Sequence, residues 1–179
     1  SPRKVSVKMA ADIISKIPPM VEPVGVFVDE ELIEKIVETV KKCRLKLVQL
    51  HGKEQPEYIQ ALRDKLQDPG VKIIKAFRIK GEGSLPNLLR YKDIVDYFLL
   101  DTYVEGVEGG TGETFNWEIA KEAKKYEKPI FLAGGLTPEN VANAVEAAEP
   151  FAVDTASGVE RLPRRKDYEK LKGFILNAK

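Results

Sequence analysis

Six apolar, β-branched runs recur along the chain, each bounded by turn residues. They are PVGVFV at 23–28, LKLVQL at 45–50, VKIIKAF at 71–77, VDYFLLD at 95–101, PIFLA at 129–133 and PFAVD at 150–154. Almost continuously hydrophobic runs are typical of parallel strands buried on both faces, whereas half-exposed antiparallel strands alternate more clearly. The pattern therefore predicts six strands of a parallel sheet.

Helical spacing of apolar residues fills the segments between these runs. In DEELIEKIVETVKKC at 29–43, Asp29 is a candidate N-cap, and Ile36 and Val40 share one face. Pro56 and Pro138 stand where the first turn of a helix accepts proline. Further helices are predicted at 10–17, 56–66, 84–93, 116–127, 137–149 and 166–179.

The order of these elements, a helix followed by six strand–helix pairs, narrows the fold class. A strand recurs roughly every 21 to 32 residues, which indicates βα units in either a (β/α) barrel or an open doubly wound sheet. No GxGxxG follows the first strand, which disfavours the dinucleotide-binding open sheet. Polar or glycine residues follow nearly every strand, where a barrel would gather them at one mouth. We therefore expect an α/β (β/α)8 TIM barrel, with six of its eight strands in a single domain over 1–179.

Composition and charge exclude several classes of partner. The 179 residues are 43% hydrophobic and 32% charged, which suits one soluble domain. The net charge of +1 creates no field for holding nucleic acid or an anionic membrane. The single cysteine cannot form an internal disulfide, and no apolar run approaches the about 20 residues of a spanning helix. Because the first residues lack a signal-peptide core, we expect a cytoplasmic protein.

Glycines after the last two strands are candidates for phosphate binding. Gly134 and Gly135 follow PIFLA, and Gly158 follows PFAVD, each before a predicted helix. Glycine lets backbone approach a ligand, and the loops after the last two strands of a barrel commonly bind phosphate. The alternative is that these glycines only permit tight turns. The glycine-rich stretch at 105–115 is a candidate lid or a plain flexible connection.

Five other side chains stand at positions that suggest a role, functional for some and structural for others. Asp101 closes an apolar strand, where a raised pKa would suit a general acid; the alternative is an N-cap or an ion-paired carboxylate. Asp154 has the same position and is expected to orient the phosphate site. His51, the only histidine, would bind a ligand or support the structure. Arg3 would clamp a carboxylate or remain solvated. Cys43 is expected to be a small buried apolar residue.

Taken together, these stretches resemble the phosphoribosylanthranilate isomerase family. The matching stretches, in the family's order and spacing from residue 1 to 179, are VGVFV at 24–28, LVQLHG at 47–52, IKAF at 74–77, LLDT followed by GGTGETFNW within 99–117, LAGGLTPENV at 132–141 and FAVDTASGVE at 151–160. The resemblance implies a (β/α)8 barrel that converts N-(5-phosphoribosyl)anthranilate to 1-(2-carboxyphenylamino)-1-deoxyribulose 5-phosphate in tryptophan biosynthesis. It implies no metal and no organic cofactor.

The resemblance also assigns roles to residues. Asp101 matches the general acid that protonates the furanose ring oxygen and opens the sugar to a Schiff base. A cysteine in the family's first strand then removes the C2 proton. Arg3 matches the arginine that contacts the anthranilate carboxylate. The remaining matches are His51 at the strand end, Gly134, Gly135, Ser157 and Gly158 in the phosphate loops, and Asp154 beside them.

The sequence departs from the family pattern at several positions. The family begins with a strand, a helix and a strand before a loop like SPRKVS, so its cysteine has no counterpart here. We therefore expect a barrel that is incomplete at its N-terminus, and we expect these 179 residues on their own to isomerise the substrate poorly. Thr155 and Ala156 stand where an apolar residue and serine are common, and Asn116 where aspartate is common.

The resemblance and composition together predict a phosphorylated small-molecule substrate, no nucleic-acid or membrane partner, and a monomer or homodimer. Two alternatives stay open. One is a non-catalytic phosphate-binding module, or a barrel fragment that needs a separate N-terminal segment. The other is a different phosphate-binding barrel enzyme such as indole-glycerol-phosphate synthase, whose catalytic lysine has a single counterpart candidate at a strand end, Lys75.

Overall fold

The computed structural model describes residues 3–101 and 117–179, which fall into two compact units. The N-terminal unit comprises 4–76 and 90–97, and the C-terminal unit comprises 1–3, 77–89 and 98–179. Strands β1 to β6 follow one another in the sheet in chain order, as successive βα units require. The candidate lid at 105–115 and Asn116 lie outside the described residues.

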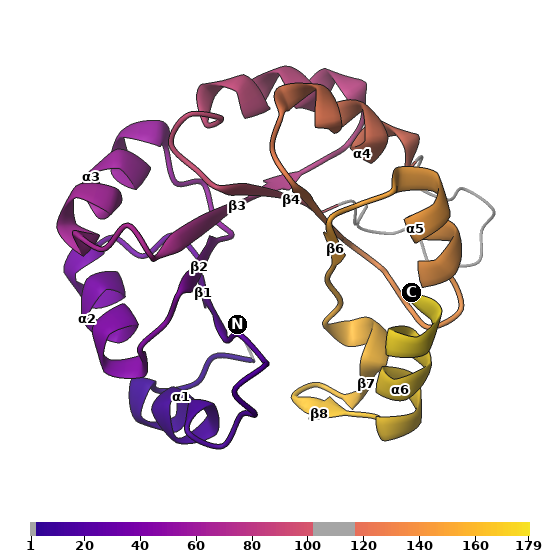
Figure 1. Cartoon of the computed structure of the whole chain (residues 1–179), viewed down its shortest axis with the longest axis horizontal. Coiled ribbons are helices and arrows are strands. Elements are labelled where there is room, and N and C mark those ends of the chain that lie inside the picture. The colour runs from indigo at the N-terminus through magenta and orange to yellow at the C-terminus, as the bar shows by residue number, and fades with distance from the viewer. Residues whose placement is uncertain (1–2, 102–116) are drawn as a thin grey trace. The chain divides into compact units, whose positions relative to one another are not determined.

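Three parallel strands organise the N-terminal unit (Figure 1). They are β1 (Val24–Phe27), β2 (Leu47–Leu50) and β3 (Lys72–Arg78), all within predicted runs or one residue beyond them. In register, Val24 lies opposite Leu47 and Leu47 opposite Lys72. Val48 and Leu50 of the central strand have no exposed surface, as expected for a strand covered on both faces.

Helices α1 (Val7–Ile14), α2 (Ile33–Cys43) and α3 (Pro56–Leu66) lie on one side of these strands (Figure 1). Ser6 caps α1, because its hydroxyl accepts the Met9 N–H at 3.2 Å. Pro56 occupies the first turn of α3, as predicted. The prediction of Asp29 as an N-cap is wrong: α2 is preceded by Leu32, and Asp29 lies in the left-handed region at φ 47°. Its carboxylate accepts the Lys53 N–H at 2.6 Å instead.

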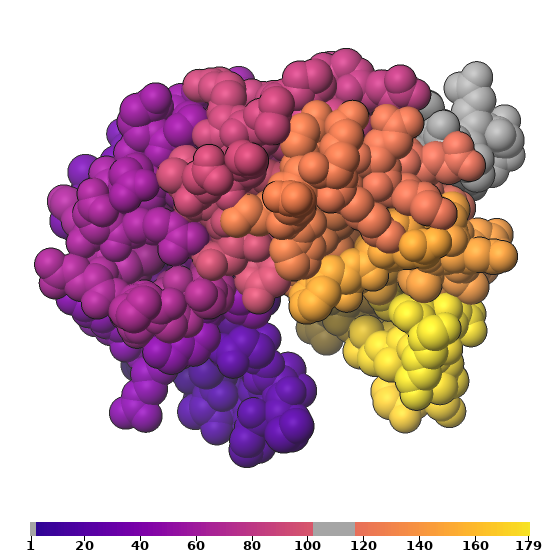
Figure 2. All heavy atoms as spheres, turned by 45° about the horizontal axis from the view of Figure 1, so that its top comes forward, coloured from indigo at the N-terminus to yellow at the C-terminus, as the bar shows by residue number. Residues whose placement is uncertain are grey.

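The C-terminal unit repeats the parallel arrangement. Its strands are β4 (Tyr97–Asp101), whose first residue belongs to the other unit, β5 (Ile130–Ala133) and β6 (Ala152–Val153). Its helical segments are η1 (Glu82–Arg90, whose last residue belongs to the other unit), α4 (Glu118–Glu122), η2 (Ala123–Tyr126), α5 (Val141–Ala148), η3 (Ser157–Val159) and α6 (Tyr168–Asn177). Helices α5 and α6 lie side by side, in orange and yellow in Figure 2.

Two details of this unit differ from the predictions. Pro138 lies in a turn before α5 and not in its first turn, because the helix begins only at Val141. A short antiparallel hairpin, β7 (Glu160–Leu162) with β8 (Arg165–Lys166), was not predicted. Its residues are mostly charged and exposed, so no apolar alternation marks it as strand.

The C-terminal unit has an aromatic pair in its core. Phe98 has no exposed surface, and its ring meets Phe77 edge-on with centroids 5.3 Å apart. A second pair, Phe131 and Phe151, has centroids 5.7 Å apart, but Phe151 is 64% exposed. The two aromatic contacts therefore differ in burial, because Phe98 is fully buried and Phe151 is exposed.

We expect Phe98→Ala to lower the free energy of unfolding by about 3–5 kcal/mol, because it leaves a cavity among fixed neighbours. Phe151→Ala is the matched control and should cost about 1 kcal/mol, the value of an exposed aromatic contact. Urea unfolding followed by circular dichroism measures both. Equal losses for the two variants would contradict the burial difference.

Candidate functional site

Asp101 and the glycines after β5 lie at the same edge of the sheet. The register places Asp101, the last residue of β4, opposite Ala133, so Gly134 follows directly. The next strand continues this edge, because the Asp154 N–H donates to the Leu132 carbonyl at 2.8 Å. Asp101 is half-buried, and its carbonyl accepts the Ile79 N–H at 2.9 Å. Three of the predicted site positions are thus brought together by strand pairing alone.

The loop after β5 needs its two glycines. Gly134 and Gly135 have φ values of 97° and 65°, which side chains rarely adopt. Asn140 closes the loop: its Oδ1 accepts the Thr137 N–H at 2.8 Å, and its Nδ2 donates to the Gly135 carbonyl at 3.0 Å. The two glycines therefore do permit a tight turn, and their contact with phosphate stays a prediction.

The loop after β6 is packed directly onto the loop after β5. A Cβ added to Gly158 would lie 1.9 Å from the Leu136 carbonyl oxygen, so only glycine fits there. The Thr155 hydroxyl donates to the same carbonyl at 2.7 Å. Thr155, a departure from the family pattern, therefore joins the two loops. Ser157 begins the short helix η3 that follows.

Arg3 is paired with a carboxylate of the protein itself. Its Nε donates to Glu160 Oε1 at 2.9 Å and its Nη2 to Oε2 at 2.5 Å, so the pair is bidentate. The Glu160 side chain is only 5% exposed, whereas that of Arg3 is 39% exposed. The alternative of a merely solvated Arg3 is therefore wrong. Arg3 does hold a carboxylate, as expected, but in this structure that carboxylate is the side chain of Glu160.

The environment of Glu160 strongly favours its charged form. The hydrogen bond from Arg3 is the largest cause that lowers the pKa of Glu160 from 4.5 to about 2; burial opposes it. The Arg164 N–H at 3.2 Å and the Lys166 ammonium at 3.4 Å, both on Oε1, reinforce the effect. The same pairing raises the pKa of Arg3. Both groups therefore stay ionised across the physiological range.

His51 lies in the N-terminal unit, directly after β2. Its backbone N–H donates to the Phe27 carbonyl at 2.8 Å, and its ring is half-buried. Ring Nδ1 lies 2.8 Å from Gln49 Nε2. His51 is thus held by its strand in one ring orientation.

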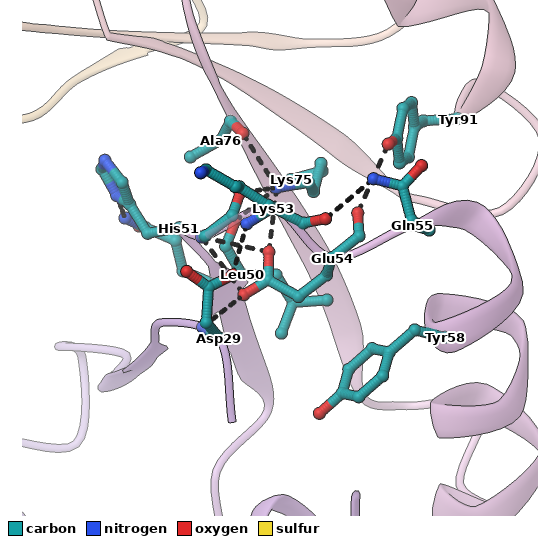
Figure 3. Close-up of polar contacts among 12 residues, drawn as sticks. Asp29, Leu50, His51, Lys53, Glu54, Gln55, Tyr58, Lys75, Ala76 and Tyr91 are labelled. Atoms are coloured by element: carbon teal, nitrogen blue, oxygen red, sulfur yellow. Dashed lines mark hydrogen bonds and ion pairs between the residues drawn. The ribbon is translucent and has the colours of Figure 1, made fainter. Parts of the chain in front are cut away.

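Sequence reasoning missed a buried ion pair beside His51 (Figure 3). Lys75 Nζ lies 3.0 Å from Glu54 Oε2, and both side chains are 3% exposed. The ammonium also donates to the carbonyls of Gly52 at 2.8 Å and Ala76 at 3.1 Å. The sequence placed Lys75 at a strand end as a candidate catalytic lysine; that position is wrong, because Lys75 lies in the middle of β3. Its burial and full set of acceptors give it a structural role instead.

Glu54 connects this pair to the neighbouring loops. Its Oε1 accepts the Asp29 N–H at 3.0 Å, and its Oε2 accepts the Gly52 N–H at 3.0 Å. Lys75 and Glu54 therefore hold the backbone on the C-terminal side of His51 and tie it to the end of β1 (Figure 3). No local pattern marks this cluster, because its charges are 21 residues apart.

Two further expectations concern cysteine and metal. Cys43 is 3% exposed at the end of α2, with Sγ 3.8 Å from the Val7 carbonyl, so the buried apolar reading is confirmed. In the part of the chain that the structure describes, no group of three or more acidic, histidine or cysteine side chains is placed to hold a metal ion. Across those same residues, no helix has the length and apolar content to cross a bilayer.

Parallel βα units with polar residues and glycine loops at the strand ends define the class of (β/α)-barrel enzymes. The family model for N-(5'-phosphoribosyl)anthranilate isomerase matches residues 1–177. The chain therefore belongs to this family and is an isomerase of tryptophan biosynthesis. It is 46% identical over 179 residues to the isomerase of Geobacter metallireducens, covering all of this chain and 83% of that one. The isomerase of Geobacter sp. strain M21 is 48% identical, with 82% covered.

Solved structures confirm the predicted TIM-barrel-like fold. The isomerase of Thermotoga maritima matches with a TM-score of 0.85 and 39% identity, covering 99% of this chain and 82% of that one. A second isomerase structure, in complex with reduced 1-(o-carboxyphenylamino)-1-deoxyribulose 5-phosphate, matches with a TM-score of 0.84 and 36% identity, covering 99% and 81%. A third, of monomers generated from the dimeric Thermotoga maritima enzyme, has a TM-score of 0.82 and 35% identity, covering 99% and 81%.

Breaking the Lys75–Glu54 pair from either side should cost about 3–5 kcal/mol of unfolding free energy, because it leaves an uncompensated buried charge. Lys75→Met and Glu54→Gln are the single variants, measured by chemical denaturation. The double variant should lose clearly less than the sum of the two. The exposed pair Lys65 and Glu34 is the control and should lose about 0–1 kcal/mol. Additive losses at Lys75 and Glu54 would show that they do not interact.

The Glu160 carboxylate should not titrate between about pH 5 and pH 3 in carbon-detected NMR. Because its pKa is lower in the folded state, its contribution to stability is complete above about pH 4.5 and is lost as the pH falls towards 2. In Arg3→Ala the pKa should rise towards 4.5. In Arg161→Ala, which removes an exposed neighbouring arginine, it should remain low. A Glu160 that titrates normally in the unsubstituted protein would refute the pairing.

Proposed function

We propose that Asp101 is the general acid of N-(5'-phosphoribosyl)anthranilate isomerisation. The observation that supports this role is its register: Asp101 ends β4 opposite Ala133, beside the loop that begins at Gly134. A carboxyl group there lies within the same unit as both glycine loops and Arg3. The family resemblance supplies the chemistry, since the aspartate of the LLDT stretch is its acid.

In the proposed reaction Asp101 donates its proton to the furanose ring oxygen. The bond from that oxygen to C1 breaks, and the nitrogen lone pair forms the C=N bond of a Schiff base. Removal of the C2 proton then gives an enolamine, which tautomerises to the ketone. These reaction steps only transfer protons and shift electron pairs within the substrate, which fits a family without a cofactor.

The base that removes the C2 proton is not Cys43. That thiol is 3% exposed at the end of a helix, where a substrate carbon has no access. The family's cysteine base has no counterpart in this sequence. We therefore assign the base to no residue of the described ranges 3–101 and 117–179.

We infer that the protein binds the substrate at both of its ends, the carboxylate and the phosphate. Arg3 would contact the anthranilate carboxylate, and Gly134, Gly135, Ser157 and Gly158 would contact the phosphate. The ligand in the related structure supports this division, because it carries a carboxyphenyl group at one end and a phosphate at the other. Asp154 directly follows β6, and the family resemblance assigns His51 a ligand contact.

The oligomeric state and the cellular location are predictions that rest on the family alone. A relative is described as dimeric, so a homodimer and a monomer both remain consistent with the proposal. A cytoplasmic location also stays a prediction. Neither changes the roles of the site residues.

Asp101→Asn should lower kcat by about 10²–10⁴-fold, because the amide keeps the shape of the acid but cannot give up a proton. Fluorescence turnover assays measure the rate on the chain extended by the family's N-terminal strand, helix and strand, which carry the expected cysteine base. Calorimetry with the product should give an unchanged Kd.

The exposed Asp12→Asn on α1 is the control and should retain full activity. Near-normal turnover by Asp101→Asn would remove Asp101 as the acid. Product binding without any turnover by the unsubstituted protein would instead favour a non-catalytic binding module.

A further inference from the structure

Glu160 connects three parts of the C-terminal unit. Its carboxylate holds Arg3 through two hydrogen bonds, and its Oε1 also accepts from the Arg164 backbone in the β7–β8 hairpin. Lys166, on the opposite strand of that hairpin, lies 3.4 Å from Oε1 and donates to the Ala156 carbonyl at 2.6 Å. One buried carboxylate thus links Arg3 to the loop that contains Ser157 and Gly158.

The geometry of the Arg3 pair has a directional consequence. Glu160 engages the edge of the guanidinium formed by Nε and Nη2. A guanidinium is planar and rigid, so fixing one edge fixes the direction of the edge formed by Nη1 and Nη2. Side-chain torsions alone would leave the Arg3 guanidinium with many orientations. Glu160 therefore sets where Arg3 presents its N–H groups.

We propose that Glu160 is a positioning residue for substrate recognition. It orients Arg3 towards the substrate carboxylate and, through Lys166, holds the loop at 154–158 that would take the phosphate. This inference rests on the proposed binding roles of Arg3 and that loop. Glu160 does not touch the substrate in this scheme, and it acts by preorganising both ends of the binding site.

The test compares two ligands that differ by one carboxylate. The first is reduced 1-(o-carboxyphenylamino)-1-deoxyribulose 5-phosphate, and the second is its phenylamino analogue without the carboxylate. The Kd of the analogue divided by the Kd of the carboxylate-bearing ligand isolates the contribution of Arg3. Calorimetry on the chain extended by the family's N-terminal strand, helix and strand measures both values. A purely structural role of Glu160 would weaken both ligands equally and leave this ratio unchanged.

Glu160→Gln should reduce the ratio about tenfold, since the amide no longer offers the charge-assisted bidentate partner. Arg3→Ala should reduce it at least as much, and adding Glu160→Gln to Arg3→Ala should change it no further. Lys166→Met should weaken both ligands by the same factor, because it acts on the phosphate loop. Glu146→Gln, exposed on α5, is the matched control and should change neither Kd.

An unchanged ratio in Glu160→Gln, with a protein that isomerises normally before substitution, would overturn this inference alone. Absence of turnover by the unsubstituted protein would instead refute the proposed function. If Glu160→Gln does not fold, Glu160→Asp replaces it. That variant keeps the charge but draws the carboxylate back by one methylene, so it should lower the ratio by displacing Arg3. A ratio in Glu160→Asp equal to that of the unsubstituted protein would also overturn the inference.

Discussion

A carboxylate that folding removes from water must find a cation, and two such carboxylates hold the strand-end loops of this isomerase. Glu54 meets Lys75 in the N-terminal unit, and Glu160 meets Arg3 in the C-terminal unit. An uncompensated buried charge is among the most destabilising changes a fold can suffer. Each carboxylate also accepts backbone N–H groups from a neighbouring loop. Neutralising the charge and shaping the loops are therefore achieved by the same contacts.

Such rigid loops suit a reaction that depends on how the substrate is positioned and needs no cofactor. An isomerisation that only moves protons needs the ring oxygen near an acid and the two substrate ends held apart at fixed points. In the proposed site, loops built from backbone and glycine would place few rotatable side chains against the substrate. The ion pairs behind them supply the rigidity that such loops lack on their own.

The sequence predicted the strands well and the polar contacts poorly. The runs VKIIKAF and PIFLA needed only local hydrophobicity to be recognised, because strands buried on both faces leave that signal. Asp29 was misassigned since a helix cap and a positive-φ loop residue favour the same side chains. The hairpin at Glu160 has no apolar alternation, and the Arg3 to Glu160 contact joins residues 157 positions apart. The family resemblance pointed to Arg3 but said nothing of Glu160, the residue that pairs with it.

The contact of Gly158 with the Leu136 carbonyl has a consequence for how the protein tolerates insertions and redesign. With 1.9 Å between that oxygen and any added Cβ, the loops after β5 and β6 have no clearance between their backbones. A lengthened or exchanged loop on one strand would push directly against the other. The two segments therefore form a single transplantable part, and neither has a length that evolution or a protein engineer is free to alter alone.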